Sequence, residues 1–138
     1  MKLFKIIFLL ILSSSCLFAK TNFFNDGLNL FEKKEFEKAK FKFEQDIVFN
    51  PKSEKSYLYL SKIYNKLEKK ELEEKNLNTV ILLNPKNEDA LYSLAKLKLK
   101  ESDFEGSKKL IDQLLVFCER YCQKSNELKI EIEKSLKR

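Results

Sequence analysis

The sequence predicts an all-α protein in which short helices form pairs and the pairs stack as a solenoid. Three observations lead to this fold class. Apolar residues recur every 34 residues, and within each period they are spaced three and four apart, as on one face of a helix. The 138 residues include only two glycines and two prolines, too few for the turns of a many-stranded β fold. With 43% apolar residues, the chain is long enough to form one continuous core.

Residues 1–19, MKLFKIIFLLILSSSCLFA, predict a bacterial export signal peptide rather than part of the fold. Lys2 and Lys5 give a positive start, an apolar stretch follows, and small residues come after it. The strongly apolar run has roughly half of the ~20 residues that a membrane-spanning helix needs. We therefore expect the mature protein in the periplasm or elsewhere in the cell envelope.

Two processing routes remain open for this segment. Cleavage after Ala19 would release a domain of residues 20–138. Alternatively, Cys16 is preceded by Leu12 and three serines, which resembles a relaxed lipoprotein box, and lipidation of Cys16 would anchor the chain to the membrane. In that case about six residues would separate the lipid from the first helix.

The repeat is marked most clearly by Asn50-Pro51 and Asn84-Pro85, which are 34 residues apart. The same step relates several apolar positions and one small-residue position. These positions are Phe23, Tyr57 and Leu91; Phe43, Leu77 and Ile111; Ile47, Ile81 and Leu115; Phe49, Leu83 and Phe117; Leu60, Leu94 and Leu128; and Gly27, Ser61 and Ala95. A pair of such short helices cannot bury its apolar stripe alone, so neighbouring pairs must cover it.

The apolar spacing and the breaks predict seven helices, grouped into repeats of about 22–53, 54–87 and 88–121 and a last helix of about 123–136. The helices are expected at 22–34, 36–49, 54–68, 70–83, 88–100, 104–118 and 123–136. The last helix has a single apolar stripe, Leu128, Ile132 and Leu136, among charged residues, which is typical of a helix that caps a solenoid. Ser102 and Glu105 are spaced as a capping box for the sixth helix.

With its repeats aligned at this period of 34 residues, the sequence resembles the tetratricopeptide repeat (TPR) family. Residues 34–51 are similar to the second helix and closing proline of that repeat, and 102–107 to its inter-helix turn. The resemblance covers about 22–121. It implies a right-handed α-solenoid of three TPR helix pairs plus a C-terminal capping helix. Glu73 departs from the family pattern at the tight helix-crossing position, so we expect looser packing there or a side chain that bends out to solvent.

In TPR arrays the first helix of each pair lines a concave groove that binds partner proteins. Carried over to this chain, the resemblance implies a groove lined by Phe24, Leu28, Phe31, Leu58, Tyr59, Lys62, Asn65, Lys66, Tyr92, Lys96, Leu99 and Lys100. Aromatic side chains would anchor, and lysines would orient, a peptide or helix with hydrophobic and acidic residues. The alternative is that these lysines form only a solvated helix face.

One well-known kind of TPR groove clamps the C-terminal carboxylate of a partner. Phe24 and Leu28 stand where the first Lys and Asn of that clamp would be. The resemblance therefore implies that this chain does not bind the tails of cytosolic chaperones.

Enzyme chemistry is not expected. The sequence has no histidine for a general base, and its two glycines are isolated, so it lacks a phosphate-binding loop. No residue set suggests a metal site or a cofactor. The formal net charge is +6, but the basic residues are spread along the chain, so nucleic acid is not an expected partner.

Cys118 and Cys122 lie four residues apart, where the sixth and seventh predicted helices should separate. A disulfide would pin the capping helix to the last repeat if the compartment is oxidising. Two reduced, partly buried thiols are the alternative.

The function that these observations predict is a protein–protein interaction module, an adaptor or scaffold in the bacterial cell envelope, for a partner protein whose identity the sequence does not give. A monomer is the expected state. The alternative is a self-associating structural envelope protein that stacks through its first repeat, where Phe23, Phe24 and Phe31 are concentrated. Membrane contact is expected only through a lipid on Cys16.

Overall fold

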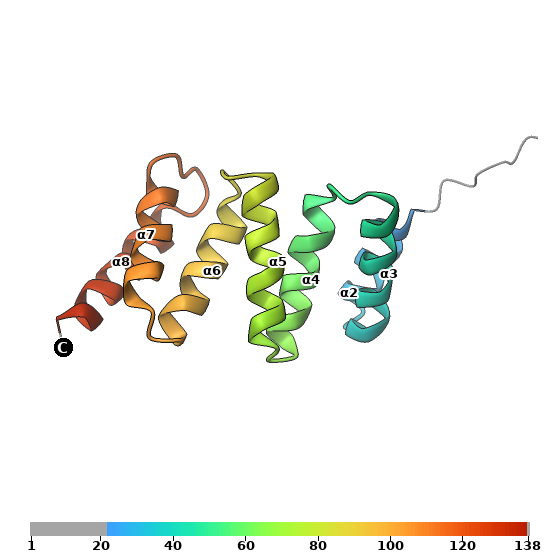
Figure 1. The fold of residues 1–138 in the computed structure, drawn as a ribbon, viewed down its shortest axis with the longest axis horizontal. Coiled ribbons are helices and arrows are strands. Elements are labelled where there is room, and N and C mark those ends of the chain that lie inside the picture. The colour runs from blue at the N-terminus through green and yellow to red at the C-terminus, as the bar shows by residue number, and fades with distance from the viewer. Residues whose placement is uncertain (1–21, 138) are drawn as a thin grey trace, which may run out of the picture.

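The computed structural model describes residues 22–137, which form seven α-helices and no strand within that range. The helices stand side by side in one row from α2 to α8 (Figure 1). Their bounds are α2 Phe23–Glu32, α3 Phe36–Phe49, α4 Glu54–Lys66, α5 Lys70–Leu83, α6 Glu88–Lys100, α7 Phe104–Leu115 and α8 Cys122–Leu136. The predicted all-α solenoid is confirmed. The predicted signal peptide and Cys16 lie outside the described residues.

The turns inside each pair explain why α2 and α4 end two residues before the predicted bounds. Lys34, Glu68 and Ser102 have φ values of 61°, 56° and 62°, and they are 34 residues apart. In each turn the next backbone N–H donates back to a carbonyl in the last turn of the helix, as from Glu35 to Leu30 at 2.9 Å. A residue in the left-handed region therefore terminates the first helix of every pair.

The predicted capping box of α7 is wrong in one residue. Asp103, not Ser102, is the N-cap, and its Oδ1 accepts a hydrogen bond from the Gly106 N–H at 2.9 Å. Ser102 cannot take this place because it occupies the left-handed position of the turn. At its other end α7 stops at Leu115 rather than 118.

The core consists of three apolar clusters, of which two span successive helix pairs and the third joins the last pair to α8. The first cluster joins Ala39 and Phe43 of α3 to Leu60, Ile63 and Tyr64 of α4. The second joins α4 and α5 to α6, and the third joins α6 and α7 to α8. Every pair therefore completes its burial against its neighbour, as the repeat predicts.

The small residue of each first helix allows close helix crossing. A Cβ atom added to Gly27 would lie 2.8 Å from Cε1 of Phe43, closer than two such atoms can approach. Ser61 and Ala95, at the same position of the next two pairs, are almost fully buried. Gly27, Ser61 and Ala95 therefore recur in the sequence because the helices pack closely at this position.

The helix connections divide between two margins of the row (Figure 1). The first helix of each pair begins, and the second ends, at the upper margin, which we call the junction margin. It comprises the segments 50–53, 84–87 and 116–121 and the start of α2. Both prolines lie there, in the turns between pairs. The turns within pairs lie at the opposite margin.

We expect glycine at the three left-handed positions to stabilise the fold. Lys34→Gly, Glu68→Gly and Ser102→Gly each remove a Cβ that disfavours this backbone conformation, for about 0.5–1 kcal/mol per site after glycine's own entropy cost. Chemical denaturation of the single and triple variants measures the gain. Lys75→Gly, in the exposed interior of α5, is the matched control and should lose about 1 kcal/mol. Equal losses at both kinds of site would contradict the prediction.

Candidate functional site

A hollow with a volume of about 350 Å³ lies between α4 and α6, with α2 at one end and the start of α8 at the other. We call it the lysine hollow because five of its lining residues are lysines. It is lined by Phe31, Ser61, Lys62, Asn65, Lys66, Glu73, Tyr92, Ser93, Lys96, Leu97, Lys100, Tyr121 and Lys124. Its volume suits a few side chains of a ligand rather than a whole small domain.

The charge of the lysine hollow is strongly unbalanced. Its five lysines face one carboxylate, that of Glu73. Within residues 22–137 none of the five lies within ion-pair distance of an acidic side chain, whereas lysines such as Lys98, Lys108 and Lys129 do. Lysines held together without partners raise the local positive potential and attract anionic groups.

Two tyrosines add flat apolar surface to these charges. The rings of Tyr92 and Tyr121 lie 5.0 Å apart, centroid to centroid. The ammonium of Lys96 lies 5.8 Å from the centroid of Tyr92, and that of Lys124 lies 5.6 Å from the centroid of Tyr121. These cation–π contacts are favourable and keep the two ammonium groups near the rings. The site therefore pairs cationic and aromatic contacts within one small volume.

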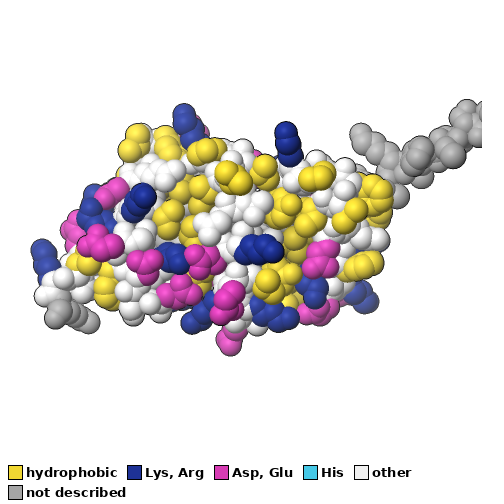
Figure 2. Space-filling view, in the orientation of Figure 1, with side chains coloured by type: hydrophobic (Ala, Val, Ile, Leu, Met, Phe, Trp, Pro, Cys, Tyr) yellow, Lys and Arg dark blue, Asp and Glu magenta, His cyan; other side chains and the backbone are white. Residues whose placement is uncertain are grey.

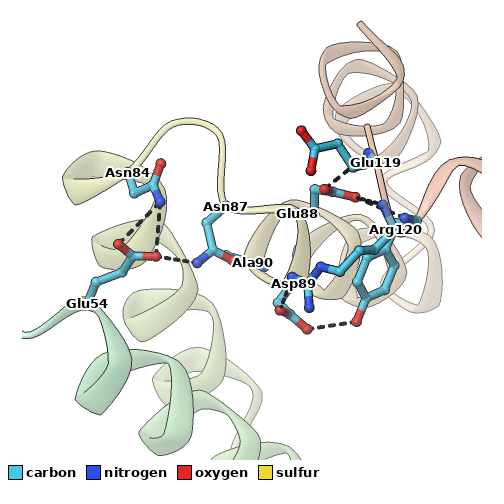
Figure 3. A network of polar contacts seen from close by, with 9 residues as sticks. Glu54, Asn84, Asn87, Glu88, Asp89, Ala90, Glu119 and Arg120 are labelled. Atoms are coloured by element: carbon cyan, nitrogen blue, oxygen red, sulfur yellow. Dashed lines mark hydrogen bonds and ion pairs between the residues drawn. The ribbon is translucent and has the colours of Figure 1, made fainter. Parts of the chain in front are cut away.

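A polar network at the N-terminus of α6 places Tyr121 in the hollow (Figure 3). The Glu88 carboxylate accepts hydrogen bonds from the backbone N–H groups of Glu119, Arg120 and Tyr121, at 3.2, 3.0 and 2.9 Å. Burial raises the pKa of Glu88, but these three donors outweigh it, so the pKa lies below its ordinary value. The connection between α7 and α8 is thereby fixed to α6.

Asp89 fixes the tyrosine ring itself. The Tyr121 hydroxyl donates to Asp89 Oδ1 at 2.7 Å, and Arg120 donates to Oδ2 of the same carboxylate at 2.9 Å. Burial, followed by the hydrogen bond to Asp89, raises the pKa of Tyr121 to about 12. The phenol is therefore neutral at physiological pH and presents its ring, not a charge, to the hollow.

The same device occurs one repeat earlier, also drawn in Figure 3. Glu54 is 34 residues before Glu88 and likewise opens the first helix of a pair. Its carboxylate accepts hydrogen bonds from the side-chain amides of Asn84, at 3.1 and 3.2 Å, and of Asn87. Asn87 in turn accepts from the Ala90 N–H at 2.8 Å and caps α6. A glutamate at the head of the second and of the third pair thus holds the next connection in place.

Glu73 corrects a prediction from the sequence. It neither bends out to solvent nor loosens the pair, because only 6% of its surface is exposed and Asn65 Nδ2 donates to both its carboxylate oxygens, at 3.0 and 3.1 Å. Burial raises its pKa more than this hydrogen bond and the nearby Lys100 lower it. The carboxylate forms one wall of the lysine hollow.

The structure brings together seven of the twelve residues that the resemblance placed in a groove. These are Phe31, Lys62, Asn65, Lys66, Tyr92, Lys96 and Lys100. Leu99 lines a second, adjoining hollow between α6 and α8. The other four lie elsewhere. Leu58 is only 8% exposed and packs against α5 and α6, so it belongs to the core rather than the groove.

The predicted apolar end of the groove is largely filled by its own aromatic side chains. Phe24 and Tyr59 pack with Phe43, their rings 5.7 and 5.2 Å from its ring. Phe31 contacts Tyr59 edge-on at 5.1 Å. Leu28 is half-buried and does not line the hollow. The aromatic side chains that were predicted to contact a ligand therefore pack against one another within the core of the first repeat.

The residues that the prediction missed are Ser61, Glu73, Ser93, Leu97, Tyr121 and Lys124. Glu73 carried a signal, since it departs from the repeat pattern. Tyr121 and Lys124 lie at the end of a connection whose path depends on Glu88, and no spacing in the sequence indicates that path.

Cys118 and Cys122 are joined by a disulfide, with their Cα atoms 5.3 Å apart. The bond closes a short loop immediately before α8, next to the Glu88 network. In residues 22–137 no group of three or more His, Cys, Asp or Glu side chains is arranged to hold a metal ion. No helix in that range is long and apolar enough to cross a membrane.

No protein-family model matches the chain, and no curated protein sequence matches it. Solved structures do match. The first TPR domain of Spaghetti (RPAP3) bound to the HSP90 peptide SRMEEVD is 18% identical, with a TM-score of 0.75 over 84% of this chain and 91% of that one. The translocator chaperone SycD of Yersinia enterocolitica type III secretion is 11% identical, with a TM-score of 0.75 over 84% and 92%. The TPR2B domain of yeast Sti1 in complex with pHsp70 is 14% identical, with a TM-score of 0.70 over 78% and 90%. The chain therefore has the TPR fold.

Glu73→Gln should stabilise the protein at neutral pH by about 1 kcal/mol, because it removes a buried charge and keeps an acceptor for Asn65. The raised pKa of Glu73 means that the wild type loses stability as pH rises from the ordinary carboxyl range through the folded-state pKa. The gain should therefore disappear below about pH 4, where Glu73 is protonated in both states. Urea unfolding at both pH values measures this difference. A gain that is independent of pH would show that charge burial is not its cause.

Proposed function

We propose that this chain is a protein-interaction module of the bacterial cell envelope, whose lysine hollow binds an acidic segment of a partner protein. The observation that carries the proposal is the set of five hollow lysines, which lack ion-pair partners within residues 22–137 and lie around the Tyr92–Tyr121 ring pair. Carboxylates of a ligand would supply the missing negative charge, and an apolar or aromatic side chain would lie on the rings.

Two features suggest how the hollow would select its ligand. Lysine ammonium groups steer and orient an acidic segment without demanding one fixed geometry. Tyr121, held by Asp89, offers a rigid ring that loses little freedom on binding. Glu73 opposes a ligand carboxylate at one wall. An acidic side chain should therefore bind toward Lys96 and Lys124 rather than beside Glu73.

A structurally similar domain supports a peptide ligand, since the first TPR domain of Spaghetti is bound to a peptide that ends in acidic residues, SRMEEVD. The ligand of the present chain should still differ from such a tail. Phe24 packs on Phe43 and Tyr59, so it offers no cation at the place where a carboxylate clamp has one. We propose an internal acidic segment, or one with an aromatic residue, as the ligand.

The adaptor proposal is favoured over self-stacking through the first repeat. Phe24 and Phe31 are turned into the first apolar cluster, and Phe23 stacks on Phe49 with 5.4 Å between the ring centroids. The three rings of α2 are thereby partly buried, and the aromatic side chains of the first repeat that stay exposed are Phe41 and Phe49 of α3, at 57 and 74%. A monomer in size-exclusion chromatography with light scattering would agree with this proposal, and an oligomer that grows with concentration would favour self-stacking.

Reversing the charge of the hollow should abolish acidic ligand binding. The variant carries Lys62→Glu, Lys66→Glu, Lys96→Glu and Lys100→Glu. We expect the affinity for acidic peptides selected on the wild type to fall about 100-fold, because four reversed ion contacts at about 0.7 kcal/mol each weaken binding by about 3 kcal/mol in total. Fluorescence anisotropy measures the affinity, and raised salt should weaken wild-type binding.

The matched control reverses four exposed lysines outside the hollow, Lys33, Lys75, Lys109 and Lys134. It changes the net charge equally and should leave affinity within about threefold, by screening of distant charges. Circular dichroism checks that both variants keep their helices. Equal loss in the two variants would place the ligand outside the hollow.

The envelope location rests on the sequence of residues 1–19, and intact-mass spectrometry of the native protein tests it. An N-terminus at Lys20 would indicate cleavage after Ala19, and a diacylglycerol adduct on Cys16 would indicate a lipoprotein. A native protein that keeps Met1 and the whole segment would contradict export by either route.

A further inference from the structure

The junction margin carries a row of exposed apolar side chains at the period of the fold. Val48, Leu82 and Val116 are 34 residues apart and are 72, 82 and 84% exposed. Val48 and Leu82 lie one residue before the ends of α3 and α5, and Val116 is the C-cap of α7. We call them the apolar row. Side chains this exposed at three equivalent positions contribute nothing to the core.

The opposite margin has a different character. Its turns carry charged residues, such as Lys34, Glu68 and Asp103. Figure 2 shows the contrast on one face of the molecule: hydrophobic side chains gather along the upper margin, and acidic and basic side chains are mixed along the lower one. One margin of the solenoid is therefore polar, whereas the junction margin exposes apolar side chains to water.

Basic residues accompany the apolar row at the same period. Lys52, Lys86 and Arg120 are 34 residues apart, and all three are exposed. We call them the basic row. The carboxylates two residues after Lys52 and Lys86 turn inward: Glu54 accepts from asparagine amides and Glu88 from backbone N–H groups. Arg120 pairs with Asp89 but keeps 67% of its side chain exposed. Glu119 is the exposed acidic residue in these connections.

The N-terminal segment joins the domain at this margin as well. α2 begins at Phe23, beside the C-terminal end of α3, as the stacking of Phe23 on Phe49 shows. Residues 1–19, with their apolar stretch, precede it. With a lipid on Cys16, the six residues that follow could extend about 20 Å at most, and this tether would hold the junction margin near the bilayer.

We propose that the junction margin is a surface that lies on an anionic lipid bilayer. The apolar row would enter the interfacial region, and the basic row would lie among the phosphates, as in other peripheral membrane surfaces that combine the two kinds of contact. The described helices would stay outside the hydrocarbon layer. This surface meets the lysine hollow only at the connection 116–121, which carries Tyr121, and the hollow lysines take no part in it, so the two proposals can fail independently.

The chain has no tryptophan, which allows a single reporter to be introduced. Leu82→Trp places it in the apolar row. Leu72→Trp places it at the other end of the same helix, at a leucine that is 39% exposed. The full-length protein is mixed with phosphatidylcholine vesicles with or without phosphatidylglycerol. We expect the emission of Leu82→Trp to shift to shorter wavelength with the anionic vesicles, and brominated acyl chains to quench it. Leu72→Trp should not respond.

A second variant tests the charges, with Lys52→Glu, Lys86→Glu and Arg120→Glu added to Leu82→Trp. Its apparent affinity for anionic vesicles should fall at least about tenfold. An equal response at positions 72 and 82, or none at 82, would overturn the proposal. So would an emission shift without lipid that grows with protein concentration, since a second copy would then cover the margin. Equal binding to vesicles without phosphatidylglycerol would remove the role of the basic row.

Discussion

The structure depends on one constraint: no helix pair can bury its apolar face except against the next pair. Phe43 of α3 is fully buried only because α4 brings Leu60 and Ile63 to it. Leu128 and Ile132 of α8 likewise cover Ala95 and Ile111 of the last pair. α8 is therefore required although it has no partner of its own, because without it the third cluster would face water.

Polar contacts then fix how each pair is joined to the next. Glu54 and Glu88 are equivalent residues, and each one uses its carboxylate to hold the connection that follows its own pair. The hydrogen bonds of Glu88 also shape the lysine hollow, because they help to set the position of Tyr121. The position of the capping helix and the shape of the lysine hollow are thus coupled through Glu88, and a change there should disturb both.

Much of the fold could be predicted because apolar and small residues recur along the sequence at the period of the helix pairs. Gly27, Ser61 and Ala95 recur because helices cross closely at those points. The helix ends were harder. Lys34, Glu68 and Ser102 adopt the left-handed conformation without being glycine or asparagine, so the usual signal for a helix stop is missing.

The site was predictable only in part, for a similar reason. Lys62, Lys66, Lys96 and Lys100 could be predicted from the resemblance to the repeat family together with their helical spacing. The positions of Tyr121 and Lys124 depend on a connection held by long-range hydrogen bonds, and the packing of Phe24 on Tyr59 depends on ring geometry. Neither effect leaves a periodic trace. The lack of ion-pair partners for these lysines within residues 22–137 is likewise a property of the folded surface.

The left-handed residue in the turn within each pair has a consequence for the length of the whole array. Lys34, Glu68 and Ser102 adopt nearly the same φ, so one local backbone conformation recurs in all three turns. Inserting a further 34-residue unit with the same turn would lengthen the row of helices without new information from distant parts of the sequence.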